Sequence, residues 1–333
     1  MDINKLFDDL YEKVKDYDII MIHSDISYLI YNFDETQIKQ KFFEYFKRLV
    51  DSNKTIIIPT FNWGFCQGKE YHYINSKSQV GILSKWCLES ELFERTNDPV
   101  YSCAIYGPNK DIFLDCEYST AFGKNSVFDK VNSLNSIVIL INNQHLSIVH
   151  YYEELKKVPY RYIKKFISSV NFNNSEENYE YDMFVRKLES NVNLSIDQYG
   201  HKSFLNKYIG SIIDRVIYNK DFYIDFIPMD KFGIAINNDL DLDINMLIKS
   251  NNFIYNIRDD NLVNFSKCSF DFNPNHTSEL FASKTIFGKR VVYGIYLFML
   301  AFNNFQTLKK LKFKKINCTF LKAVLIDENI NIK

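Results

Sequence analysis

A histidine and a glutamate three residues apart are the side chains in this sequence best placed for acid–base chemistry. His150 and Glu153 follow the apolar run 136–141 (SIVILI), whose β-branched residues are typical of a strand buried on both faces. A helical pattern starts near Ile148, and on a helix this spacing puts the two side chains on one face, about 5–6 Å apart. An imidazole beside a carboxylate at the carboxyl end of a buried strand is typical of α/β active sites. A solvated pair on a surface helix has the same spacing, so the flanking sequence must decide.

The elements before this pair indicate a sheet with helices on its faces. Residues 18–23 (DIIMIH) and 55–60 (TIIIPT) are apolar strands, and helical patterns cover 2–16 and 35–50. Such a strand–helix–strand series predicts a parallel sheet. Half of the glycines and prolines lie between 59 and 123, which predicts long loops, interrupted by a helix at 80–93. Loops carried by a rigid sheet are where binding sites are common.

Farther along the chain the composition changes twice. Residues 167–197 are rich in Asn, Ser, Glu and Tyr, which indicates an insertion or a surface hairpin. A helix is expected at 202–218 and a strand at 221–227. The polar and acidic stretch 237–245 indicates the approach to a domain boundary. We therefore expect two domains, 1–250 and 251–333.

Composition excludes several classes of partner. Forty basic and forty-one acidic residues leave the net charge near zero, so neither nucleic acid nor an anionic membrane is expected as the main partner. A hydrophobic content of 46% is enough for a substantial core. The N-terminus lacks the basic-then-apolar order of a signal peptide. Six cysteines without C-x-x-C spacing indicate reduced thiols, and no His/Cys cluster suggests a metal. A cytoplasmic protein is expected.

Five short pieces of the first 250 residues carry a resemblance. They are 21–27 (MIHSDIS), 55–63 (TIIIPTFNW), 95–102 (RTNDPVYS), 122–126 (FGKNS) and the H-x-x-E of 150–153. No single piece is specific, but the ordered set resembles the aminoglycoside 3-N-acetyltransferase family. The resemblance implies a three-layer α/β/α sandwich and transfer of an acyl group from coenzyme A to a sugar amine. In that chemistry His150 would take the proton of the amine and Glu153 would orient the ring.

The same resemblance suggests which other residues contact the substrates. Coenzyme A contacts are expected from His23, Ser24, Thr60, Phe61, Gly123 and Ser126. Acceptor contacts are expected from Asp25, Arg95, Asp98 and Tyr101. Each group has a structural alternative: His23 can be a hydrogen-bonded core residue, Ser126 a helix cap, and the loop 95–101 a turn held by a salt bridge around Pro99. The family's serine pair after the first histidine is Ser24-Asp25 here, a departure that either alters contacts to the cofactor or helps to recognise an amine.

A second resemblance starts near residue 257. The D-x-N-P-x-H core stands as Asp271, Asn273, Pro274 and His276, with Gly294 at a supporting position. It resembles the start of a MaoC-like, hot-dog-fold (R)-specific enoyl-CoA hydratase. By resemblance, Asp271 and His276 would activate water, Asn273 would hold the loop, and the Gly294 N–H would face the thioester oxygen. An Asx-type turn is the structural alternative. Tyr293 replaces a histidine common there.

The hot-dog module is expected to be incomplete. Strands are expected at 311–320 and 323–332, which are fewer than such a fold needs to wrap its helix. Three explanations stay open: a longer polypeptide, completion by a partner, or a dimerisation surface without activity. A homodimer through this module is expected.

These observations combine into one main hypothesis. The chain is predicted to be an N-acyltransferase that moves an acyl group, such as 3-hydroxybutanoyl, from coenzyme A to a nucleotide-linked amino sugar destined for surface polysaccharide. The alternatives are an aminoglycoside 3-N-acetyltransferase, a bifunctional protein with enoyl-CoA hydratase activity, and a non-catalytic acyl-CoA-binding module.

Overall fold

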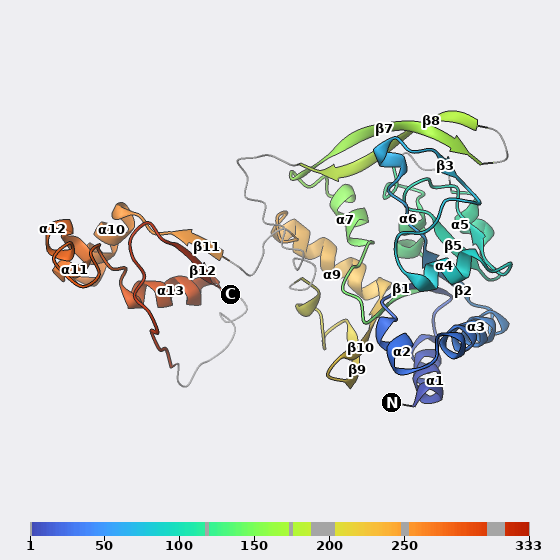
Figure 1. Ribbon diagram of the computed structural model, residues 1–333, viewed down its shortest axis with the longest axis horizontal. Coiled ribbons are helices and arrows are strands. Elements are labelled where there is room, and N and C mark those ends of the chain that lie inside the picture. The colour runs from blue at the N-terminus through green and yellow to red at the C-terminus, as the bar shows by residue number, and fades with distance from the viewer. Residues whose placement is uncertain are drawn as a thin grey trace. The chain divides into compact units, whose positions relative to one another are not determined.

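The computed structural model divides into two compact units, Met1–Ile248 and Lys249–Lys333 (Figure 1). It describes residues 2–116, 120–172, 176–187, 204–247, 253–304 and 317–332. Each unit is described by itself below.

A seven-stranded mixed sheet forms the centre of the first unit. Its strands lie in the order β4-β5-β2-β1-β6-β10-β9. The central strands β2, β1 and β6 are parallel, as the apolar runs predicted, whereas β4, β5, β10 and β9 add antiparallel edges. Their bounds are β1 Ile19–Ser24, β2 Thr55–Pro59, β4 Glu94–Arg95, β5 Cys103–Tyr106, β6 Ser136–Ile141, β9 Asp214–Asn219 and β10 Phe222–Pro228.

Alternate strand residues bury into two separate apolar layers. On β1, Ile20 and Ile22 face one layer while Ile19 and Met21 face the other. Helices α1 (Ile3–Val14), α2 (Ser27–Asn32), α3 (Glu35–Asp51) and α4 (Ile82–Leu88) cover the first layer. Helices α5 (Asp111–Leu114), α6 (Val127–Ser133), α7 (Val149–Leu155) and α9 (Met229–Leu242) cover the second (Figure 1). The unit is therefore the three-layer α/β/α sandwich that the resemblance implied.

The helices of the first layer are specified locally. Asp2 caps α1 by accepting a hydrogen bond from the Asn4 N–H, and Asp34 caps α3 by accepting one from the Gln37 N–H. Apolar residues then recur at helical spacing, Ile38 and Phe42 on α3 among them, and both are fully buried. The caps and the spacing together explain why these two helices begin and pack where they do.

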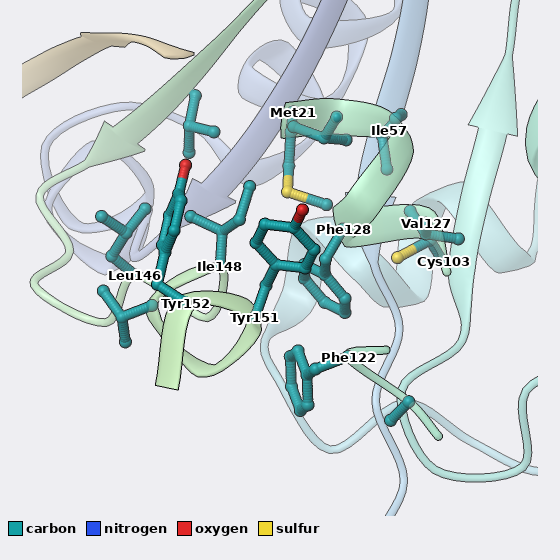
Figure 2. Close-up of a cluster of buried hydrophobic side chains, with 14 of the residues drawn as sticks. Met21, Ile57, Cys103, Phe122, Val127, Phe128, Leu146, Ile148, Tyr151 and Tyr152 are labelled. Carbon is teal, nitrogen blue, oxygen red and sulfur yellow. The ribbon is translucent and has the colours of Figure 1, made fainter. Parts of the chain in front are cut away.

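The helix that carries the His/Glu pair is fixed by packing on its neighbour. Figure 2 shows Tyr151 of α7 next to Phe128 of α6 and Met21 of β1. The Tyr151 hydroxyl donates to Asp129 Oδ1 at 2.9 Å, and the Tyr152 hydroxyl donates to Asn132 Oδ1 at 2.6 Å. Both acceptors lie on α6, so the two hydrogen bonds hold α7 in one orientation.

A long antiparallel hairpin follows α7. Strands β7 (Arg161–Asn171) and β8 (Glu176–Arg186) pair along their full length, and β3 (Tyr71–His72) adds a third strand beside β7 (Figure 1). The prediction of a hairpin in this region is confirmed in type, but it begins earlier than expected. The predicted helix at 202–218 is wrong in its second half, because Gly210 forms a turn at φ +79° and β9 follows.

The second unit has a small core. It contains β11 (Phe253–Asn256) paired with β12 (Asn329–Ile332), and helices α10 (Asp259–Ser269), α11 (Pro274–Thr277), α12 (Glu279–Ala282) and α13 (Gly294–Asn304). The strand predicted at 311–320 falls partly outside the described residues, and 317–320 is irregular. Of the strand predicted at 323–332, only β12 forms.

Candidate active site

A cavity of about 380 Å³ lies at the carboxyl ends of β1 and β2, beside the start of α7. Parallel strands place their loops at this edge, where α/β proteins bind ligands. The cavity is lined by Ile22, His23, Ser24, Pro59, Phe61, Trp63, Val80, Ser84, Tyr101, Asn143, His145, Leu146, Ser147 and His150. Aromatic and aliphatic side chains thus alternate with neutral polar groups around its wall.

His150 and Glu153 form a close pair at this wall. His150 Nδ1 lies 2.6 Å from Glu153 Oε2, and both residues are on α7. The imidazole lines the cavity, while the carboxylate is buried behind it with a side-chain exposure of 5%. The Phe122 ring meets the imidazole edge-on, with centroids 5.2 Å apart. The predicted spacing therefore produces a buried, oriented pair and not a solvated one.

Arg161 is a third ionisable group at this pair, and no sequence pattern predicted it. Its Nε lies 2.7 Å from Glu153 Oε2 and its Nη2 lies 3.0 Å from His150 Nδ1. Its Nη1 donates to the Phe184 carbonyl on β8 at 3.1 Å. The sequence shows only a cation shortly after the helix; it does not show that the turn between α7 and β7 brings this cation back to the pair.

Burial and charge set the protonation states of the pair. Burial lowers the pKa of His150, and the Arg161 charge lowers it further, against the opposing effect of Glu153. Burial alone would raise the pKa of the Glu153 carboxyl, but His150 and Arg161 outweigh it and hold that pKa at about 2. Near neutral pH the arrangement is therefore a neutral imidazole beside an ionised carboxylate, which is the state a general base requires.

Two more histidines line the cavity. His23 is buried, and within the described chain its Nε2 has no hydrogen-bond partner. Burial, with a smaller effect from His145, lowers the pKa of His23 to about 4, so this ring is neutral. His145 is exposed at the cavity.

The residues predicted to contact coenzyme A fall into two groups. His23, Ser24 and Phe61 line the cavity. Thr60 is fully buried beneath it, where its Oγ1 lies 2.9 Å from Ser102 Oγ. Two further residues belong to the turn before α6: Gly123 lies within that turn, and Ser126 caps the helix by accepting from the Asp129 N–H.

Two of the four residues predicted to contact the acceptor form hydrogen bonds inside the protein. Arg95 donates to Ser102 Oγ and to the carbonyls of Thr60, Tyr73 and Ser76. Asp98 accepts from the N–H groups of Val100 and Tyr101 and from the Tyr181 hydroxyl. These hydrogen bonds favour a structural role for both residues.

The other two predicted acceptor contacts lie at cavity walls. Tyr101 lines the main cavity, and its ring centroid is 4.9 Å from that of Phe61. Asp25 lines an adjoining hollow that shares Ser24, and its Oδ1 accepts from the Ser27 N–H at the start of α2.

The predicted hydratase residues lie together in the second unit. Asp271 Oδ1 accepts from the Asn273 N–H, which is the turn that the structural alternative anticipated. His276 Nδ1 lies 2.6 Å from the Val291 carbonyl oxygen, so Nδ1 carries the hydrogen when the ring is neutral. Tyr293 stacks on that ring at a centroid distance of 3.9 Å. A Cβ at Gly294 would come within 3.0 Å of the Phe320 ring, so glycine fits where a larger residue would clash.

Neither a metal site nor a membrane span is found in the described part of the chain. There, no three His, Cys, Asp or Glu side chains lie close enough together to hold a metal ion. None of the described helices combines the length and the apolar character needed to cross a bilayer.

Comparison with solved structures identifies the fold. AAC-IIIb in a binary complex with CoASH is 12% identical, with a TM-score of 0.58 over 72% of this chain and 96% of that chain. AAC-VIa bound to sisomicin is 12% identical, with a TM-score of 0.55 over 72% and 97%. YokD from Bacillus subtilis is 14% identical, with a TM-score of 0.53 over 71% and 97%. At these identities the similarity establishes the fold alone.

Comparison with protein families assigns both parts of the sequence. Residues 245–333 match the MaoC like domain family. A search among curated proteins finds no match. Residues 21–207, more than half of the chain, match the family described as aminoglycoside 3-N-acetyltransferase. The chain therefore belongs to the aminoglycoside 3-N-acetyltransferase family.

Proposed function

We propose that this protein is an acyl-CoA-dependent N-acyltransferase with His150 as its general base. The observation that carries the proposal is the His150–Glu153 contact of 2.6 Å at the cavity wall. An amine attacks a thioester as the free base and must lose a proton as the C–N bond forms. Since Nδ1–H of His150 donates to Glu153, Nε2 is the ring nitrogen that takes this proton.

The remaining steps follow from charge. Glu153 stabilises the imidazolium that forms, as the acid does in other base–acid pairs. The tetrahedral intermediate carries a negative charge on the former carbonyl oxygen, and hydrogen-bond donors at the cavity wall, Ser24 among them, are positioned to stabilise it. When the C–S bond breaks, the proton held by His150 passes to the leaving thiolate. The products are the amide and free coenzyme A.

The coenzyme A contacts are proposed for the six residues predicted from sequence. His23, Ser24 and Phe61 are the best supported, because they line the same cavity as His150. Thr60, Gly123 and Ser126 would act by shaping the loops around it. A relative of the same fold is described in a complex with CoASH, which supports this cosubstrate.

For the acceptor, the comparisons favour an aminoglycoside over the nucleotide-linked amino sugar that the sequence analysis preferred. The matching family is described as aminoglycoside 3-N-acetyltransferase, and a relative of the same fold is described as bound to sisomicin. Aminoglycoside N-acetylation with acetyl-CoA is therefore the first activity to measure.

One observation keeps the second acceptor class as a candidate. The cavity wall, as far as the structure describes it, contains no Asp, Glu, Lys or Arg. An aminoglycoside carries several ammonium groups, whose desolvation needs carboxylate partners. A sugar with a single amine needs none.

The MaoC-like domain supports a 3-hydroxyacyl donor, because a hydratase of that type would make such a thioester.

A matrix of donors and acceptors tests these proposals. Release of the coenzyme A thiol is followed with acetyl-CoA or (R)-3-hydroxybutanoyl-CoA, against an aminoglycoside or a nucleotide-linked amino sugar. Amide formation is confirmed by mass spectrometry. Turnover with aminoglycosides alone excludes the second candidate. The absence of amide with every pair contradicts the acyltransferase proposal.

For the second unit we propose (R)-specific enoyl-CoA hydration and homodimerisation. The hydrogen bond to Val291 leaves Nε2 as the basic nitrogen of the His276 ring, which supports water activation. Hydration of crotonyl-CoA that persists in Asp271→Asn would contradict this assignment.

A further inference from the structure

The clearest contact with no assigned role is that of Arg161 with the His150–Glu153 pair. Arg161 comes from the β7–β8 hairpin, whereas the pair comes from α7. Its guanidinium lies 2.7 Å from the Glu153 carboxylate and is anchored on the far side by the Phe184 carbonyl. We propose that Arg161 is a positioning residue that holds Glu153 and balances its charge while His150 is neutral. The inference rests on the proposed role of His150 as general base.

A buried carboxylate lowers the stability of the fold unless a positive group pairs with it. The side-chain exposure of Glu153 is 5%, and an ion so buried needs a partner. The His150 ring is neutral before the reaction, so it supplies no positive charge. Arg161 does, so the resting pair plus the guanidinium is electrically neutral. When His150 takes the proton from the amine, the net charge of the three side chains rises from zero to +1. Glu153 is paired with a positive charge before and after this step.

His150 and Arg161 interact with Glu153 in different ways, because the number of hydrogens on each nitrogen differs. Nδ1 of His150 holds one hydrogen, and the 2.6 Å contact assigns it to Glu153. Arg161 Nη2 at 3.0 Å cannot donate to that protonated nitrogen, so it acts on the ring by charge. A positive charge at this distance disfavours the imidazolium, whereas Glu153 favours it. Arg161 thus keeps the ring available as a base near neutral pH.

Other ionisable groups surround the ring without replacing this effect. Arg186 of β8 and Tyr160 before β7 both interact with Glu153 or Arg161. Burial raises the pKa of Tyr160, and the Glu153 charge adds to the shift, so its hydroxyl stays neutral. Among the described residues, His23 and His145 share the cavity wall with the ring, and Glu154 of α7 accepts a hydrogen bond from Thr120.

Arg161→Gln tests the charge, and Arg161→Lys separates charge from geometry. The His150 pKa is read from its ring resonances in an NMR titration, assigned by their loss in His150→Ala. In Arg161→Gln, the His150 pKa is expected to rise by about one unit, and kcat to fall about tenfold to a hundredfold. In Arg161→Lys, the pKa stays near that of wild type while kcat falls, because an ammonium cannot hold both Glu153 and the Phe184 carbonyl.

Lys165→Gln is the matched control. Lys165 lies on the same strand, exposed and paired with Glu180, so its loss should leave the His150 pKa unchanged. An unchanged His150 pKa in Arg161→Gln, or an equal rise in the control, overturns the inference. If Arg161→Gln does not fold, wild-type kcat in Arg161→Lys overturns it. The NMR titration needs no substrate, so the two proposals can fail separately. An unchanged His150 pKa in Arg161→Gln overturns the role of Arg161 even if His150→Ala abolishes transfer. Conversely, transfer that persists in His150→Ala overturns the general base even if the His150 pKa rises in Arg161→Gln.

Discussion

The two units of this protein close their apolar cores to different degrees. In the first unit, alternate residues of β1, β2 and β6 are buried on both faces of the sheet, and helices cover each face. In the second unit, the described buried cluster comprises Ile257, Leu262, Val292, Tyr293 and Ile326. Large apolar side chains such as Ile286 (96% exposed) and Leu321 (94%) lie outside it. The first unit completes its own core, whereas the second presents apolar surface suited to association.

The same contrast separates the two candidate sites. The His150–Glu153 pair is held by Arg161 and by the packing of α7 on α6. Asp271 is exposed and belongs to a short turn, with only His276 anchored to a backbone carbonyl. Preorganised groups in a partly buried site have stronger electrostatic effects than exposed ones. The first site is therefore the better supported centre for chemistry.

The largest effect that this comparison predicts is on acyl transfer. His150→Ala is expected to lower kcat about 10²–10⁴-fold, because the proton of the amine loses its acceptor. Steady-state kinetics with the best acceptor measure it. His276→Ala in the second unit is the matched control and should leave this kcat unchanged. A comparable loss in both variants would break the distinction between the two sites.

A pair of phenylalanine substitutions tests the difference between the cores. Phe42→Ala on α3 removes a fully buried ring and is expected to cost about 3–5 kcal/mol of unfolding free energy. Phe272→Ala, at 60% exposure, is expected to change it by less than about 0.5 kcal/mol. Urea unfolding followed by circular dichroism gives both values. Equal losses would mean that Phe272 is buried by association.

The smallest predicted effect concerns oligomeric state. If the second unit associates with a copy of itself, Ile286→Asp places an unpaired charge in that surface and is expected to weaken the dimer at least about tenfold. Ile234→Asp on α9 is the control, because Ile234 is also exposed, at 67%, but belongs to the first unit. Light scattering over a concentration series reports the change. A wild-type protein that stays monomeric throughout contradicts the dimer.

The sequence predicted those parts of the fold that local patterns encode. Strands β1, β2 and β6 lie within a residue of their expected bounds, because a short run of β-branched residues between polar ends is typical of a buried strand. The antiparallel pairings of β5 with β2 and of β10 with β6 join distant segments, which no local pattern shows. The segment that became β9 carries apolar residues at spacings that also suit a helix, and its pairing with β10 decided between them.

The candidate site likewise contains residues that a local pattern predicts and residues that it does not. His150 and Glu153 are three residues apart, so their proximity follows from one helix. Arg161 reaches them through the turn that joins α7 to β7, where the Val158 N–H donates to the Glu153 carbonyl, and Trp63 and His145 reach the cavity through loops. Conversely, the family resemblance implied acceptor contacts from Arg95 and Asp98. Their hydrogen bonds are instead satisfied inside the protein.

One paired measurement tests the central claim most directly: the pH dependence of kcat/KM for acyl transfer beside the NMR titration of His150 in the same protein. Transfer requires the neutral ring, so the rate should fall as pH drops through the His150 pKa. That pKa lies below the ordinary value of about 6.5, because burial and Arg161 lower it. We predict that the acidic limb of the profile coincides with the His150 titration and disappears in His150→Ala. A limb that persists in that variant would contradict His150 as the base.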